Sequence, residues 1–120
     1  MKFTIPIAPV TKKNHQRIVR NKKTGARFVV PSEQYTEYES AAGWFVPKKY
    51  ITGRVNVKAL FYMPTHRKVD LTNLNEALHD VLVKYNCLMD DNSEIIVSTD
   101  GSRVLYDKDN PRTEVEITEV

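Results

Sequence analysis

Apolar and polar residues alternate along several short stretches of the chain, which is the pattern of β-strands with one buried face. Apolar residues at every second position, or in short runs, predict strands at 3–7, 53–63 and 95–97. Two more strands are expected at 104–106 and 113–117, joined as a hairpin by the turn at 107–111. The chain therefore carries enough strands for one sheet.

A separate hairpin is predicted within the basic stretch near the N-terminus. Ile18-Val19 on one side and 28–30 on the other flank the sequence Asn21-Lys22-Lys23-Thr24-Gly25. Two short apolar runs around a polar, glycine-containing segment are typical of paired antiparallel strands.

Two segments instead repeat their apolar residues every three or four positions, which predicts helices. The first is expected over about 33–46, with Ser32 as its N-cap and Pro47 after its end. The second is expected over 71–86, with Asp70 as N-cap and Asn86 as a C-terminal cap. Its apolar stripe consists of Leu71, Leu74, Leu78, Leu82 and Tyr85.

The order of these elements predicts an α+β fold with a mixed β-sheet and two helices packed on one face. At 120 residues, and with no Pro/Gly/Ser-rich linker, residues 1–120 are expected to form a single domain. A domain of this length buries roughly two-thirds of the surface of its extended chain, which is sufficient for folding without cross-links.

Other features of the composition narrow the class of protein. Cys87 is the single cysteine, so no internal disulfide forms. The N-terminal residues lack the apolar segment of a signal peptide, and no apolar run approaches the ~20 residues of a membrane span. A cytoplasmic location without membrane contact is therefore expected. The sequence has no Gly-rich phosphate loop and no Ser-His-Asp order, so neither a nucleotide cofactor nor acyl-transfer chemistry is expected.

The net charge is only +3, but its distribution is uneven. Residues 1–32 contain eight Lys and Arg and no acid, whereas the remaining residues contain ten basic and fifteen acidic side chains. A cationic arm on an acid-rich body attracts a polyanion such as a nucleic acid. The alternative is a solvated loop that only keeps the protein soluble, and charge alone does not decide between them.

Three acids stand where the predicted elements begin or end. Asp70 precedes the second helix, and Asp90-Asp91 precede the strand at 95–97. Carboxylates in such places hold Mg²⁺ ions that hydrolyse phosphodiesters, because the ions stabilise the phosphate charge and generate hydroxide. Taken singly, an Asp in the place of Asp70 is more often a helix cap than a metal ligand, and Asp90-Asp91 are typical of a polar turn. Asp80 and Lys84 have the spacing of an ordinary surface ion pair within one helix.

The combined pattern is more specific. Its parts are Arg67-Lys68-Val69-Asp70-Leu71-Thr72-Asn73-Leu74, a helix with Ala77 and Asp80, Leu88-Met89-Asp90-Asp91-Asn92-Ser93, and the N-terminal Pro-Val-Thr-Lys-Lys-Asn from Pro9 to Asn14. This arrangement resembles the RusA family of Holliday junction resolvases over nearly the whole chain.

The resemblance implies a Mg²⁺-dependent homodimer, with Mn²⁺ as a substitute metal, that cuts branched double-stranded DNA in recombination or repair. It also leads us to expect a bacteriophage or prophage source. By position, the resemblance makes Asp70 and Asp91 catalytic metal ligands. Asp90, next to Asp91, would be a further ligand or a residue that holds a ligand in place. The phosphate contacts expected from the basic segments are Lys12, Lys13, Asn14, Arg17, Arg20, Lys22, Lys23, Arg27, Arg67 and Lys68.

Two departures from the family pattern lie on one strip of the second helix. The family has a second Asp where this chain has Thr72, and a Lys where it has Glu76. We hypothesise that the carboxylate has moved one turn, so that Glu76 is the replacement metal ligand and one of the catalytic residues. Glu76 is equally explained as a solvated residue, and both changes together would fit a weakened or inactive junction-binding dimer. A third reading is a basic RNA-binding protein whose acids are structural.

Overall fold

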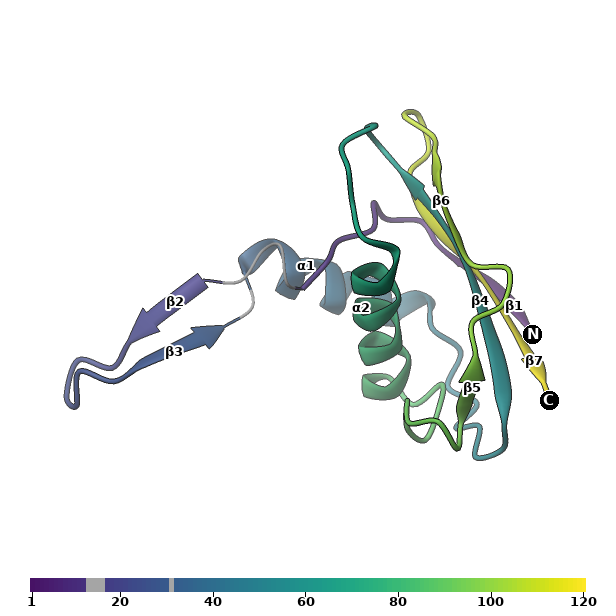
Figure 1. Ribbon diagram of the computed structural model, residues 1–120, viewed down its shortest axis with the longest axis horizontal. Coiled ribbons are helices and arrows are strands. Elements are labelled where there is room, and N and C mark those ends of the chain that lie inside the picture. The colour runs from purple at the N-terminus through teal and green to yellow at the C-terminus, as the bar shows by residue number, and fades with distance from the viewer. Residues whose placement is uncertain (13–16, 31) are drawn as a thin grey trace.

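The computed structural model describes residues 1–12, 17–30 and 32–120 (Figure 1). Its main sheet has five strands, with β4 in a central position. The strands are β1 (Lys2–Ile5), β4 (Val55–Met63), β5 (Ile96–Ser98), β6 (Arg103–Tyr106) and β7 (Arg112–Glu119). Along the sheet the order is β1-β7-β4-β5, and β6 also pairs with β4.

The pairing of the last two strands differs from the predicted hairpin. β6 pairs with β4 in parallel, whereas β7 pairs with β4 antiparallel on its other side. The turn at 107–111 therefore crosses the end of β4 instead of joining neighbours. Skipping one strand covers about 10 Å, which five residues span as easily as they close a hairpin. Periodicity along the sequence marks strands and their faces but does not choose partners.

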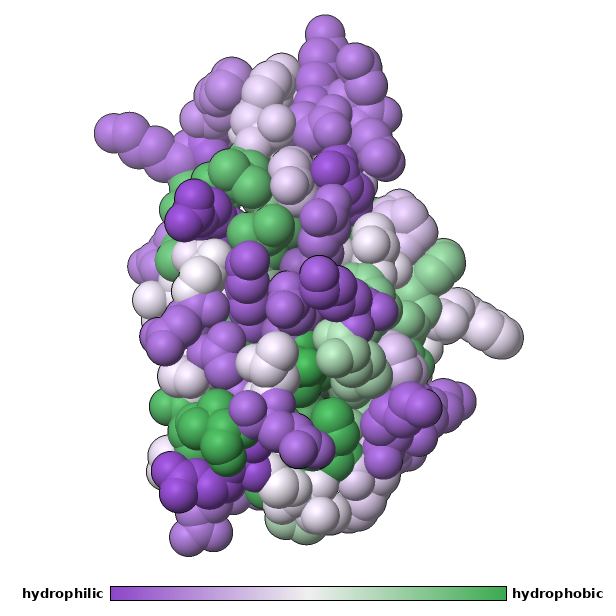
Figure 2. Space-filling view, turned by 90° about the vertical axis from the view of Figure 1, so that its right-hand side faces the viewer, coloured by the Kyte–Doolittle hydropathy of each residue, from purple (hydrophilic) through white to green (hydrophobic). Residues whose placement is uncertain are grey.

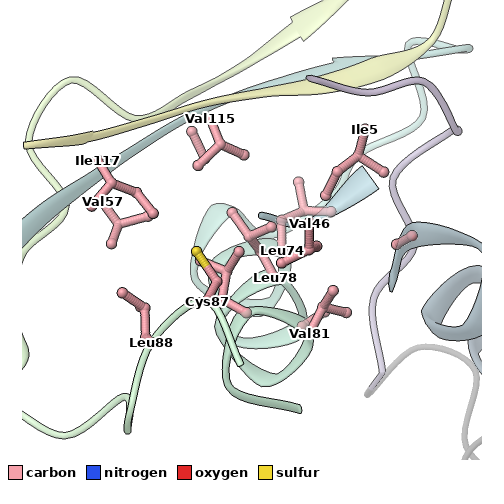
Figure 3. Close-up of a cluster of buried hydrophobic side chains, with 14 of the residues drawn as sticks. Ile5, Val46, Val57, Leu74, Leu78, Val81, Cys87, Leu88, Val115 and Ile117 are labelled. Atoms are coloured by element: carbon pink, nitrogen blue, oxygen red, sulfur yellow. The ribbon is translucent and has the colours of Figure 1, made fainter. Parts of the chain in front are cut away.

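One face of the sheet is covered by both helices, as predicted (Figure 1). Side chains at alternate positions of β4 point into this face, and α2 (Leu71–Lys84) presents its leucine stripe to them (Figure 3). The buried residues at this interface include Val57, Phe61, Leu74, Leu78, Val81, Leu82, Val115 and Ile117. Figure 2 shows the opposite face, where apolar patches lie among hydrophilic side chains.

The first helix is shorter than predicted. α1 (Glu33–Ala42) passes into the 3₁₀ turn η2 (Gly43–Phe45), so together they cover 33–45 of the expected 33–46. Ser32 caps α1 as expected, because its Oγ accepts a hydrogen bond from the Tyr35 amide at 3.2 Å. Tyr35 and Tyr38 are buried and bring α1 into the core.

Both predicted caps of α2 are present. Asp70 Oδ1 accepts the Thr72 N–H at 2.9 Å. The helix ends at Lys84, two residues earlier than expected, and Asn86 then adopts a φ of 63°. The Cys87 amide donates back to the Leu82 carbonyl at 2.9 Å, a closure that requires this left-handed residue.

The predicted N-terminal hairpin is confirmed. β2 (Arg17–Arg20) pairs antiparallel with β3 (Arg27–Val30), and the pair projects from the helical side of the molecule (Figure 1). The Asn21 side chain accepts the amide of Lys23 at 2.9 Å, and Gly25 has a φ of +72°. Positive φ is the reason that a glycine suits this turn.

Candidate active site

Asp70 lies at the exposed N-terminus of α2, where its carboxylate caps the helix. Arg67 and Lys68 are exposed in the loop that leads to it. The same short segment therefore places two cations within three residues of an acid at a helix N-terminus, where the helix dipole favours negative charge, including that of a phosphate group.

Asp90 and Asp91 have different surroundings, although they are adjacent. Asp90 organises the turn: its Oδ1 accepts the Asp91 amide at 2.7 Å, and its Oδ2 accepts the Asn92 side-chain amide at 3.1 Å. The Asn92 carbonyl in turn accepts the amides of Ile95 and Ile96. Asp90 is half-buried, whereas Asp91 is exposed. The turn held by Asp90 thus presents Asp91 at the surface.

Asp91 lies beside the middle of α2, where Asp80 and Glu76 also stand. Burial raises the pKa of Asp80, the Lys12 ammonium opposes that shift, and the negative charges of Asp91 and Glu76 add to it. Burial lowers the pKa of His79, with a smaller upward effect from Asp91. We call Glu76, Asp80 and Asp91 the acidic cluster, because each of the other two carboxylates contributes to the potential at Asp80.

Asp80 is the residue of this cluster that the sequence analysis missed. The predicted ion pair between Asp80 and Lys84 is wrong: Lys84 Nζ pairs with Glu39 of α1 at 2.5 Å, and Asp80 Oδ2 pairs with Lys12 Nζ at 3.6 Å. Spacing within one helix does not reveal a partner on another segment. The available signal was the shared strip of residues 72, 76 and 80, which already held both departures from the family pattern.

Lys12 reaches the cluster from the N-terminal segment. Val10 and Thr11 before it are buried, which anchors this segment against the core. The Lys12 ammonium lies 5.8 Å from the centre of the Tyr35 ring. Burial raises the pKa of Tyr35, and the negative charges of Glu39 and Asp80 add to this shift. Lys12 is thus held between the Tyr35 ring and the carboxylate of Asp80, which is a member of the acidic cluster.

The cluster and Asp70 occupy different levels of α2. Ten residues separate Asp70 from Asp80, which corresponds to about 15 Å along a helix. Within residues 1–12, 17–30 and 32–120, no three His, Cys, Asp or Glu side chains converge closely enough to form a metal site. The metal-ligand set Asp70, Asp90, Asp91 and Glu76 therefore stays a prediction.

The predicted DNA contacts that the structure describes fall into two exposed surfaces and one partly exposed position. Arg20, Lys22, Lys23 and Arg27 are exposed on the β2–β3 hairpin, where Arg17 also lies. Arg67 and Lys68 are exposed beside the start of α2. Lys12 faces the acidic cluster, and Lys13 and Asn14 lie outside the described residues.

Comparison with known families covers almost the whole chain. The family model described as endodeoxyribonuclease RusA matches residues 6–118 of the 120. The chain belongs to the RusA endodeoxyribonuclease family. A comparison with curated protein sequences found no match. Membership of the RusA family makes DNA the substrate class and hydrolytic cleavage of its backbone the activity. In the described part of the chain, no helix has the length and apolar character needed to span a membrane.

Proposed function

We propose that this RusA-family protein is a Mg²⁺-dependent, structure-selective endodeoxyribonuclease that cuts four-way DNA junctions as a homodimer during recombination or repair. The observation that supports it is the acidic cluster beside the middle of α2, with the Lys12 ammonium paired to its member Asp80. A cation next to grouped carboxylates is suited to phosphate chemistry, because it reduces the repulsion between the acids and the DNA backbone.

The acids of the cluster are the right type of donor for Mg²⁺, although no three His, Cys, Asp or Glu side chains of the described residues converge on one ion. The ion prefers carboxylate oxygens and water. Burial is the main cause of the raised pKa of Asp80, and the negative charges of Asp91 and Glu76 add to it. Asp91 and Glu76 would hold the Mg²⁺ ion, with Asp90 fixing the turn. Asp70 lies about 15 Å from Asp80 along the helix, so its role as a further ligand stays a prediction. Bound Mg²⁺ supplies Lewis-acid polarisation of the scissile phosphate. Within the chain itself, Asp80 orients Lys12, and Lys12 binds a phosphate oxygen.

The basic surfaces would bind the arms of the junction. Arg20, Lys22, Lys23 and Arg27 extend from the body on the hairpin, so they reach a duplex that the acidic cluster repels. Six to ten phosphate contacts predict an affinity loss of about 10³- to 10⁵-fold between 50 and 200 mM salt. A two-fold dimer matches the near two-fold symmetry of a four-way junction and supplies one active site to each cut strand.

A cleavage assay on a synthetic four-way junction tests this function. We expect paired nicks with Mg²⁺ or Mn²⁺ and none with a chelator. Asp91→Asn and Glu76→Gln should each reduce the cleavage rate by about 100-fold or more while the junction still binds. Cleavage that persists in the chelator, or that is unchanged in both variants, would overturn the proposed mechanism.

The second candidate is a junction-binding dimer with weakened or lost cleavage. Thr72 and Glu76 favour it, because the family pattern has Asp and Lys at these positions. The double variant Thr72→Asp/Glu76→Lys restores that pattern on the exposed strip of α2. A gain of cleavage in this variant over an inactive parent would support the second candidate. An active parent that loses activity in the same variant would support Glu76 as the working carboxylate.

A further inference from the structure

His66 and Tyr106 form a stacked aromatic pair at the surface. Their ring centroids are 3.7 Å apart and their planes differ by 29°. His66 is in the loop before α2 and Tyr106 is the last residue of β6, so tertiary structure brings them together. His66 is exposed, and Tyr106 retains 42% of its surface in solvent. This pair plays no part in the function proposed above.

The pair borders a hollow of about 380 Å³ between that loop and β6. Besides the aromatic pair, the apolar side chains of Met63, Val104 and Leu105 and the cations Arg67 and Lys68 line it. Arg67 and Lys68 are exposed. Flat aromatic surface beside positive charge is the combination that binds single-stranded nucleic acid, because bases stack on the rings while cations hold the phosphates.

We propose that this hollow binds one unpaired nucleobase of the DNA, stacked on the His66–Tyr106 pair, with its phosphate held by Arg67 and Lys68. The proposal rests on the proposed function in taking branched DNA as the ligand. Bases of a perfect duplex are already stacked on their neighbours, so the hollow favours DNA whose bases are open at a branch point. The hollow would therefore account for part of the protein's preference for branched DNA over a plain duplex.

The position of the hollow relates it to cleavage. His66 precedes Asp70 by four residues, so their backbones are at most about 14 Å apart. A base held on the aromatic pair thus stands within a few nucleotides of a phosphate at the start of α2. Binding one base would fix the register of the strand relative to the catalytic acids.

Fluorescence of 2-aminopurine tests the contact without any cleavage. The probe replaces one base at the branch point of a four-way junction, and binding is measured in a chelator. Stacking on the protein should change the fluorescence when the wild-type protein binds, but a probe within a duplex arm should not respond. Tyr106→Leu and His66→Ala should abolish the change and weaken junction affinity about fivefold or more. Tyr106→Phe keeps the ring and should retain both signals.

Two controls separate this effect from general damage. Trp44→Leu removes an aromatic side chain that is 88% exposed outside the hollow, and it should leave the signal unchanged. Affinity for a plain duplex of equal length should be the same in all variants. Unchanged junction binding and fluorescence in both Tyr106→Leu and His66→Ala would overturn the inference.

The same measurements distinguish this inference from the proposed function. If the wild-type protein shows the Tyr106-dependent fluorescence change but does not cut the junction with Mg²⁺, the base-binding site is supported and the nuclease mechanism is overturned. A protein without junction preference is tested with a single-stranded oligonucleotide, where Tyr106-dependent quenching supports the site and its absence overturns it.

Discussion

Lys12 and Asp80 form an ion pair, with 3.6 Å between Nζ and Oδ2, that joins the N-terminal basic segment to the middle of α2. The side chains keep 37% and 34% of their surface in solvent, so the pair itself contributes no more than about 1 kcal/mol to stability. Its consequence is positional, because it sets a positive charge at Asp80, the residue of the acidic cluster on which the charges of Asp91 and Glu76 also act.

Removing this charge should affect cleavage more than binding. Lys12→Gln is expected to lower the rate of junction cleavage about tenfold or more, with the dissociation constant changing less than threefold. Asp80→Asn should reduce the rate by releasing Lys12, so the double variant should be hardly worse than Lys12→Gln alone. Single-turnover cleavage and a binding titration measure the two quantities.

Lys23→Gln is the matched control, since it removes the same charge from the exposed turn of the hairpin. It should weaken binding slightly and reduce its salt dependence, without changing the single-turnover rate of bound DNA. Equal effects of Lys12→Gln and Lys23→Gln on rate and affinity would contradict a positioning role for Lys12.

Local periodicity in the sequence predicts the helices, the strands and their buried faces, but not which strands pair. The leucine stripe, Asp70 and Asn86 were enough to place α2 and both of its ends within two residues. The alternation in β4 likewise identified its buried face. Pairing between β4 and β6 depends on which strands compete for the edges of β4. The apolar pattern of a strand does not specify its partner. The predicted hairpin with β7 failed for that reason.

The candidate site was likewise predicted where its residues are close in sequence, and missed where they come together only in the folded chain. The resemblance to a family identified Asp70, Asp90 and Asp91 by their spacing, and these stand at the helix start and in the turn as expected. Asp80 was assigned to Lys84 because both lie on one helix at the right interval. Its partner Lys12 is 68 positions earlier, and only the folded chain brings that segment to α2.

Packing between η2 and the end of α2 predicts a steric effect of one methyl group. A Cβ at Gly43 would lie 2.5 Å from the Tyr85 ring, so Gly43→Ala must displace that ring. We expect a loss of about 1–3 kcal/mol in the free energy of unfolding. A Cβ at Gly53 meets nothing within 4 Å, so Gly53→Ala should change stability by no more than about 1 kcal/mol. Urea unfolding of the two variants checks this, and equal effects would show that Tyr85 does not restrict position 43.

The leucine stripe of α2 should dominate stability. Leu78 has no exposed surface and faces the sheet (Figure 3). Leu78→Ala removes buried methyl groups and leaves a cavity, which costs about 2–5 kcal/mol. Chemical denaturation measures the loss. Leu71→Ala at the half-buried start of the same stripe is the control and should cost clearly less; a larger loss at Leu71 would contradict the described packing.

The turn that crosses the end of β4 should depend on pH through Asp107. Arg112 holds this turn: its Nη1 donates to Asp107 Oδ2 at 2.8 Å, its Nε donates to Glu114 at 2.8 Å, and its guanidinium lies 3.8 Å from the centre of the Tyr62 ring. The hydrogen bond from Arg112, followed by one from the Asn110 amide, lowers the pKa of the Asp107 carboxyl. A carboxyl whose pKa is lower in the folded state stabilises the fold above its unfolded value near 4. That contribution is lost as pH falls through the folded value.

Asp107→Asn should therefore melt at a lower temperature than the wild type at pH 7, and the difference should shrink steadily as the pH falls below about 4. Asp109→Asn is the control, because it removes the same charge from an exposed position in the same turn. Its melting temperature should follow that of the wild type at every pH. Thermal unfolding between pH 3 and pH 7, followed by circular dichroism, measures both variants. A difference at Asp107 that stays constant across this range would mean that the hydrogen bonds to the ionised carboxylate do not stabilise the crossing.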